Sequence, residues 1–414
     1  MGLLALGTVW GGIPDVHAQG ATASPNVLSA GDSLIIKELY FKGIQQKSGG
    51  QLAAAEQTFK RLIELQPDND AAYFELSRIY LEQEDYPLAE QAARRAAELK
   101  SENSWYWSLL LDIYRKTAEI NRIPDVLTKL IELNPDEESN YHEKAYTLYL
   151  SRNFDEALEV YDTIAARFGK TDAYYLSRYQ ILMAKGESPQ AIAALEELVA
   201  QEPEESNAYI LLAERYTDSG KYSRAIELLE YAAGRFPEDP IILLSKADTY
   251  LAMGRQKKAH DYLRQAFLSE KLDIDVKAGV LYTAVSDRKQ PIDEQVIAEL
   301  ATLLTTQYPQ EAKAHAVKGD IFVRLRRFQD GRDAYRASLD INQYLDGVWQ
   351  QLLQTELQLN AFDDMTVHGT EATKLFPDHP LILFFTGLGY LGKQDHASAR
   401  QYLERALNNA DGGH

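Results

Sequence analysis

The sequence predicts an all-α fold in which helical hairpins stack into a solenoid. The first observation is the spacing of six prolines along the 414-residue chain, with intervals of 68, 68, 34, 72 and 68 residues. These prolines are Pro67, Pro135, Pro203, Pro237, Pro309 and Pro377. Four of the five intervals are multiples of 34, and one departs by four residues. A fixed period of this length is typical of a chain built from copies of one supersecondary unit.

The second observation is helical periodicity inside a single unit, from Ser206 to Pro237. Its first half carries apolar or small residues at i, i+3, i+4 and i+7, beginning at Tyr209. Gly220 then lies where a helix would end, and a second helical pattern runs from Ala225 to the residue before Pro237. Because proline cannot continue a helix, each unit is predicted to be one helical hairpin.

The third observation is a small residue that recurs midway through the unit. This position is occupied by Ala55, Ala89, Ile123, Ala157, Ala191, Ala225, Ala259, Ile297, Gly331, Met365 and Ala399. An earlier small position is occupied by Gly43, Ala145, Ala213, Ala247, Gly319 and Gly387. Small residues at these points let the two helices of a hairpin approach closely. No strand-like alternation of polar and apolar residues interrupts the pattern.

This pattern resembles the tetratricopeptide repeat (TPR), with its early large apolar residue, small residue, midway alanine and final proline. The resemblance covers nearly all of the chain after residue 36 and implies an α-solenoid, or superhelix, of about eleven hairpins. The predicted organisation is a signal peptide at 1–18, a flexible lead-in at 19–31, a TPR array at 32–409 and a tail at 410–414. Four extra residues fall somewhere between Lys271 and Pro309, at a place that the sequence leaves open.

The N-terminus predicts export. A short apolar run from Leu3 to Trp10 precedes Val16-His17-Ala18, which is typical of a signal-peptidase site before Gln19. The basic front part of a signal peptide is missing, since the first Lys or Arg is Lys37. Either the true start lies upstream or the likeness is accidental. We therefore expect a periplasmic or secreted protein, with a cytoplasmic one as the alternative.

Composition excludes several classes of function. The net charge of −19 disfavours nucleic acid and anionic lipid headgroups, and no cluster of basic and aromatic residues suggests a nucleic-acid interface. The chain has no cysteine, which excludes disulfides, thiolate metal sites and a cysteine nucleophile. No apolar run is long enough to span a bilayer.

Gly31-Asp32-Ser33-Leu34 matches the signature of GDSL esterases, in which the serine is the nucleophile. Asp411 and His414 would supply the acid and the base. An esterase serine should follow a β-strand, whereas the residues here are predicted to form hairpins. The alternative is that Asp32 caps a helix from Ser33 to Gln46.

Two further motifs are given structural interpretations. The glycine pattern from Gly387 to Gly392 matches a dinucleotide fingerprint, but it fits the packing positions of the last hairpin. His142-Glu143 begins a zinc-protease pattern, but Tyr146 stands where the second histidine is needed. We therefore predict no enzyme activity, catalytic residue, cofactor or metal.

The TPR resemblance implies a partner-binding site, because first helices of TPR hairpins line a concave face. Transferring the face positions one by one gives a candidate contact surface: Arg78, Leu81, Trp105, Asp112, Arg115, His142, Tyr146 and Tyr149. Aromatic and arginine side chains are typical anchors of binding surfaces. The alternative is that some of these aromatic residues only pack against the next repeat. The lysine of the chaperone-tail clamp is absent at its expected positions, so that mode is not predicted.

The expected function is a non-enzymatic scaffold that binds a protein or extended peptide, in bacterial envelope assembly or secretion. A cytoplasmic regulatory adaptor is the alternative. At the C-terminus no polar capping helix is evident, and Phe384, Phe385, Leu403 and Leu407 could leave an apolar end. This suggests a homodimer or a docking contact through the last repeat.

Overall fold

The computed structural model describes residues 30–286 and 292–410. The predicted signal peptide, the first eleven residues of the lead-in and the Asp411 to His414 segment lie outside the described residues. In the part that is described, the chain is helical throughout, with no strand. It divides into two compact units, Met1–Lys170 and Thr171–His414. The predicted all-α solenoid of stacked hairpins is confirmed.

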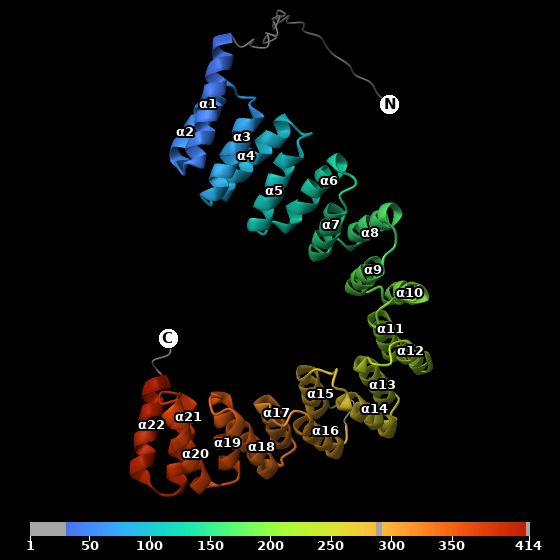
Figure 1. Cartoon of the computed structure of the whole chain (residues 1–414), viewed down its shortest axis with the longest axis vertical. Helices are drawn as coiled ribbons and strands as arrows, with labels where there is room; N and C mark the ends of the chain where they lie inside the picture. The colour runs from blue at the N-terminus through green and yellow to red at the C-terminus, as the bar shows by residue number, and fades with distance from the viewer. Residues whose placement is uncertain (1–29, 287–291, 411–414) are drawn as a thin grey trace, which may run out of the picture. The chain divides into compact units, whose positions relative to one another are not determined.

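The first unit contains four hairpins, whose helices follow one another side by side in chain order (Figure 1). Its helices are α1 (Ala30–Ser48), α2 (Leu52–Leu65), α3 (Asp70–Glu82), α4 (Tyr86–Leu99), α5 (Ser104–Lys116), the 3-10 helix η1 (Ile120–Arg122), α6 (Ile123–Leu133), α7 (Glu138–Leu150) and α8 (Phe154–Phe168).

The second unit contains seven hairpins. Its helices are α9 (Asp172–Lys185), α10 (Ser188–Ala200), α11 (Asn207–Asp218), α12 (Tyr222–Arg235), α13 (Pro240–Ala252), α14 (Gln256–Leu268), α15 (Ile274–Ser286), α16 (Glu294–Gln307), α17 (Ala312–Arg324), α18 (Phe328–Ile341), α19 (Asp346–Gln358), α20 (Phe362–Leu375), α21 (Pro380–Gly392) and α22 (His396–Ala410). Odd-numbered helices are the first helices of their hairpins, and even-numbered helices are the second.

In the hairpins whose turn residues are all described, the turn repeats one backbone conformation. At Gly220 the chain adopts a φ of +73°, and Lys221 N–H then donates back to Tyr216 O at 2.7 Å, which closes the end of α11. Left-handed residues recur at the same place in the other described turns: Gly50, Glu84, Ala118, Arg152, Gly186, Gly254, Arg326, Asn360 and Gln394. Several of these residues are not glycine, so the helices on either side impose the turn even where the residue disfavours it.

The recurring small residues lie where the two helices of a hairpin cross. A Cβ atom at Gly43 would lie 2.7 Å from Phe59 Cζ, and one at Gly387 would lie 2.7 Å from Leu403 Cγ. Every residue at the midway position is buried, from Ala55 to Ala399. Gly387 therefore lies in α21 at a point where α22 packs closely against it, as its repeat position predicts. The alternative dinucleotide fingerprint requires a strand and a turn, and neither is present at this place.

The structure corrects the predicted start of the first helix and locates the four extra residues. Helix α1 begins at Ala30, so Asp32 lies in its first turn, and the prediction that Asp32 is the N-cap was wrong. Ser33 is on this helix rather than after a strand, which leaves the esterase motif without its structural context. The four extra residues lie between α15 and α16: seven residues separate Ser286 from Glu294, against three between Ala252 and Gln256. Residues 287–291 of this connection are outside the described part.

The last helix covers more of the C-terminal end than its sequence suggested. Leu403 packs beneath Gly387, and Phe385 packs against the hairpin core, whereas Leu407 is 63% and Phe384 40% exposed. Polar residues accompany Leu407 among the exposed residues of α22, including Arg400 and Glu404. The homodimer through this repeat stays a prediction, and it depends on a smaller apolar area than we expected.

Candidate functional site

The candidate surface lies on the first helices of the first unit. Helix α3 contacts both α1 and α5, so that side chains pointing away from the hairpin cores form one continuous face. A bidentate ion pair between Arg115 and Glu143 extends this face from α5 to α7, with nitrogen–oxygen distances of 2.8 and 2.5 Å. We use the name first-helix face for the side chains of α1, α3, α5 and α7 that point away from the hairpin cores.

A groove of about 410 Å³ opens on this face. Arg78, Leu81 and Asp112, three of the eight predicted residues, line it. The other lining residues are Lys47, Glu82, Leu109 and Lys116. Because apolar and charged side chains of both signs meet here, the groove suits a polypeptide segment better than a purely apolar ligand.

Charged side chains along the groove are only partly paired with one another. Lys47 bonds the buried Glu75, and the guanidinium of Arg78 is 3.6 Å from the same carboxylate while remaining half exposed. Lys116 and Glu82 have no ion pair among the described residues. The groove therefore keeps hydrogen-bonding capacity that a partner's backbone or side chains can use.

Arg115 is held in place by two carboxylates. Its Nη1 donates to Asp112 at 3.0 Å, in addition to the paired bonds to Glu143. The hydrogen bond to Glu143 is the main reason that the pKa of the guanidinium is raised. An arginine fixed by two acidic neighbours presents its flat surface in a defined orientation, which favours stacking of a partner's side chain.

The aromatic residues of the candidate surface behave differently from one another. Trp105 is 73% and Tyr146 58% exposed, and both are large apolar groups in contact with water. In contrast, the ring of His142 lies 6.0 Å from that of Tyr161, and Tyr149 lies 6.1 Å from Phe154. His142 and Tyr149 thus pack partly within their own hairpin, whereas the alternative interpretation expected contacts with the next repeat. Trp105 and Tyr146 are the two candidate aromatic residues that remain mostly exposed.

Transferring the TPR face positions one by one missed four residues that line the groove: Lys47, Glu82, Leu109 and Lys116. For Lys47 and Lys116, the spacing of the repeat relates them to other residues of the groove. Lys47, Leu81, Arg115 and Tyr149 follow one another at intervals of 34 residues, so Lys47 occupies the same position in the first hairpin. Lys116 follows Arg115 directly and occupies the position of Glu82 one repeat earlier. Lys47 was missed because the transfer began with the second hairpin, and Lys116 was missed because its position was not among those transferred.

The lysine of the chaperone-tail clamp is absent from the corresponding described positions, as the sequence indicated. The eighth hairpin's clamp position was assigned to Tyr282 from the sequence, and this assignment was wrong: because the four extra residues follow α15, the residue in register is Ala278. Neither is a lysine, and the conclusion holds. Among the described residues no three acidic, histidine or cysteine groups are placed to hold a metal, and none of the described helices is long and apolar enough to cross a membrane.

On the first helices of the second unit, the carboxyl of Asp248 in α13 experiences the negative charge of Glu214 in α11. Burial of the Asp248 carboxyl, with a smaller contribution from the negative Glu214, raises the pKa of Asp248 from 3.8 to about 6. Asp248 as a whole is nevertheless exposed to solvent, which reduces the free energy that this pKa change represents.

We expect Asp248→Asn to stabilise the second unit at pH 7 by about 1 kcal/mol. The folded state binds the proton more tightly than the unfolded state, so the wild type loses stability as pH rises from about 4 to about 6. The asparagine variant lacks this loss. Chemical denaturation at pH 4 and pH 7 tests the prediction, and an equal effect of the substitution at both pH values would contradict it.

Comparisons with known proteins agree with this architecture. A family model described as tetratricopeptide repeat matches residues 46–104 and 142–204, and one described as anaphase-promoting complex, cyclosome, subunit 3 matches residues 184–266. No curated protein matches the chain. The chain therefore carries tetratricopeptide repeats.

Similar solved structures are distant in sequence. The structure of Naa15/Naa10 bound to HypK-THB is 11% identical, with 89% of this chain and 68% of that chain covered and a TM-score of 0.45. A tetratricopeptide repeat protein from Parabacteroides merdae is 18% identical, with 65% and 98% covered and a TM-score of 0.31. YrrB, whose structure is described as a TPR protein with an unusual peptide-binding site, is 15% identical, with 44% and 94% covered and a TM-score of 0.33.

Proposed function

We propose that this protein is a non-enzymatic scaffold that binds a protein or an extended peptide on the first-helix face of its first unit. The observation that carries the proposal is the combination of the mixed-charge groove with two exposed aromatic side chains, Trp105 and Tyr146. Buried aromatic anchors contribute much of the affinity of protein interfaces, and both residues are available to become buried. Arg78, Leu81, Asp112 and Arg115 would position the bound chain between them.

The place of action that we propose is the periplasm or the cell surface, in envelope assembly or secretion. Its support is the Val16-His17-Ala18 sequence, which lies outside the described residues. A cytoplasmic regulatory adaptor is the alternative. The mature N-terminus of protein purified from its native cells distinguishes them: export predicts Gln19, and the adaptor retains Met1.

The test of the binding face is site-specific photo-crosslinking in the native cell. A photoreactive phenylalanine analogue at position 105 or 146 is expected to capture a defined protein. The same analogue at Leu65, an exposed apolar residue of α2, should not capture it. Capture from position 65 alone, or equal capture from all three positions, would contradict the assigned face.

With the captured partner purified, Trp105→Ala combined with Tyr146→Ala is expected to weaken binding at least about tenfold, since two aromatic anchors are lost. The control pair, Arg61→Ala with Leu65→Ala, removes exposed side chains of α2 and should change affinity by less than about twofold. Thermal unfolding of both variants should match the wild type. An unchanged affinity of the aromatic double variant would remove the site.

A further inference from the structure

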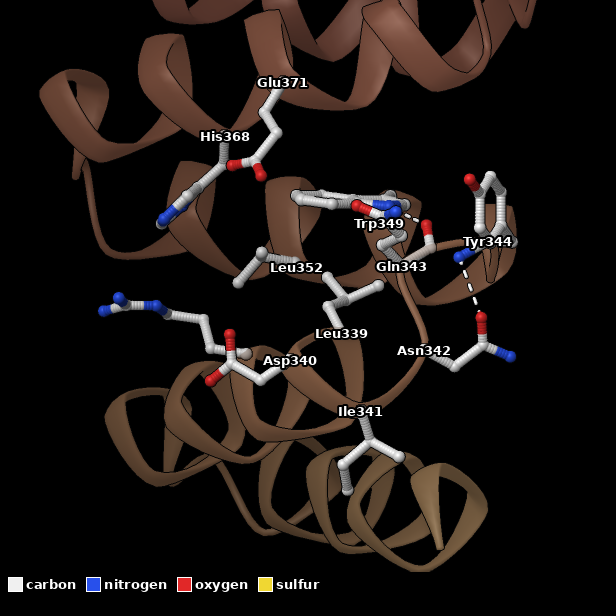
Figure 2. A pocket seen from close by; sticks show the side chains of 11 residues that line it. Leu339, Asp340, Ile341, Asn342, Gln343, Tyr344, Trp349, Leu352, His368 and Glu371 are labelled. Atoms are coloured by element: carbon white, nitrogen blue, oxygen red, sulfur yellow. Dashed lines mark hydrogen bonds between the residues drawn. The ribbon is translucent and has the colours of Figure 1, made fainter. Parts of the chain in front are cut away.

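A second pocket, of about 650 Å³, lies in the second unit (Figure 2). It is formed by the end of α18, the connection that follows, α19 and α20. Leu339, Trp349 and Leu352 give it an apolar floor, and Trp349 is only 4% exposed. The indole Nε1 donates to Gln343 O at 2.7 Å, which fixes the ring in place.

Three charged side chains around this pocket are left without partners. Arg336, Asp340 and Glu371 line it, and none of them forms an ion pair or side-chain hydrogen bond among the described residues. Arg336 and Asp340 are four residues apart on α18, a spacing at which ion pairs form elsewhere in the chain, as between Glu90 and Arg94 at 2.8 Å. Here the two side chains stay apart.

A groove at the corresponding place in the first unit, between α2, α3 and α4, shows the contrast. It has a similar volume of about 630 Å³. Its basic lining residues are paired within the hairpins: Lys60 with Glu56 at 2.6 Å, Arg94 with Glu90 at 2.8 Å and Arg95 with Glu98 at 3.2 Å. The unpaired charges are therefore a property of the α18–α20 pocket and not of the repeat.

The balance of charge around the pocket is negative. His368 also lines it, but its Nδ1 lies 2.5 Å from Oε1 of Glu356, a fully buried carboxylate that offsets any charge on the imidazole. That leaves two free carboxylates, Asp340 and Glu371, against one guanidinium. The C-terminus of α18 adds the partial negative charge of a helix end. Tyr344, which is 67% exposed, adds an aromatic face on which a cation can rest.

We propose that this pocket binds a lysine or arginine side chain of a partner protein. The two carboxylates would hold the cationic group, and the aliphatic part of the side chain would lie over Leu339, Leu352 and the edge of Trp349. Charge complementarity selects this occupant, because an acidic segment would meet both free carboxylates in a chain whose net charge is already −19. The site is separate from the first-helix face and does not depend on the function proposed there.

The experiment measures binding of a fluorescent peptide of alternating alanine and arginine by anisotropy, in 150 mM salt to screen long-range attraction. We expect Asp340→Asn combined with Glu371→Gln to weaken binding about tenfold, and Tyr344→Ala to weaken it about threefold. Arg336→Ala should leave binding unchanged or tighter. All four substituted positions are exposed, so thermal unfolding should stay close to that of the wild type.

The matched control is Glu204→Gln combined with Glu205→Gln, which removes the same charge from exposed residues of the second unit. It should change affinity by less than about twofold. An equal loss in the control would show general attraction to an acidic surface and overturn the site. Absence of binding at millimolar peptide would also overturn it. Tighter binding of the corresponding glutamate peptide, lost on Arg336→Ala, would reverse the assigned charge of the ligand.

Discussion

Replacing His368 with leucine is expected to lower the free energy of unfolding by about 3–5 kcal/mol at pH 7. The side chain of Glu356 is completely buried in α19, and His368 is its one side-chain hydrogen-bond partner among the described residues. The second carboxylate oxygen of Glu356 is buried with no partner in that part of the chain. The substitution would therefore leave a buried carboxyl group with no side-chain hydrogen-bond partner among the described residues.

The double variant Glu356→Leu with His368→Leu should recover most of this loss, because replacing both partners of a buried polar pair by apolar residues is often neutral or stabilising. In other hairpins the positions that correspond to Glu356 and His368 are occupied by two stacked tyrosines. The ring centroids are 5.5 Å apart for Tyr250 and Tyr262, and 5.4 Å apart for Tyr390 and Tyr402. Urea denaturation of the three proteins measures the effect. A single variant as stable as the wild type, or a double variant as unstable as the single one, would contradict the argument.

Gly319→Ala is expected to destabilise the hairpin of α17 and α18 by about 2–3 kcal/mol. The new Cβ atom would lie 2.5 Å from the ring of Tyr335. That ring has no room to yield, since it is 1% exposed and its hydroxyl donates to Asp320 at 2.7 Å. A single methyl group would therefore force the two helices apart or break the bond to Asp320.

Gly279→Ala is the matched control for this overpacking. Gly279 lies in the middle of α15, and its Cβ position has no neighbour within 4 Å. The same change should therefore stabilise the protein by about 0.5–1 kcal/mol, through helix propensity alone. Opposite shifts of the denaturation midpoint would establish the packing role of Gly319. A loss of stability in both variants would mean that helix conformation, and not contact with Tyr335, sets the result.

Much of the fold could be predicted because the repeat constrains it many times over. Ala225 and the other midway residues occupy the crossing of two helices, where bulky side chains have little room, and their spacing gave the hairpins directly. Structural features that occur only once, and do not recur with the repeat, were harder to predict. The start of α1 at Ala30 depends on backbone geometry that Asp32 alone does not specify. The longer connection after Ser286 could not be placed, because a loop leaves no periodic pattern.

The candidate site could be located on a face but not resolved into its contacts. The repeat predicts that Trp105 and Tyr146 point away from the core. It does not predict that Tyr149 packs on Phe154, which depends on rotamers chosen in the folded hairpin. The buried Glu356 was also missed, although its position holds tyrosine in several other hairpins, such as Tyr80 and Tyr216. Comparing each repeat with the others, position by position, would have singled it out.

The longer connection between α15 and α16 shows where a chain of this kind can grow. Four residues are added there, and the 34-residue spacing resumes after them, from Pro309 to Pro377. The addition leaves the helices of that hairpin at ordinary lengths, because it enters beyond their ends and not between their packed surfaces. Hairpin tips are accordingly the points at which an epitope or a reporter peptide can be grafted with least disturbance.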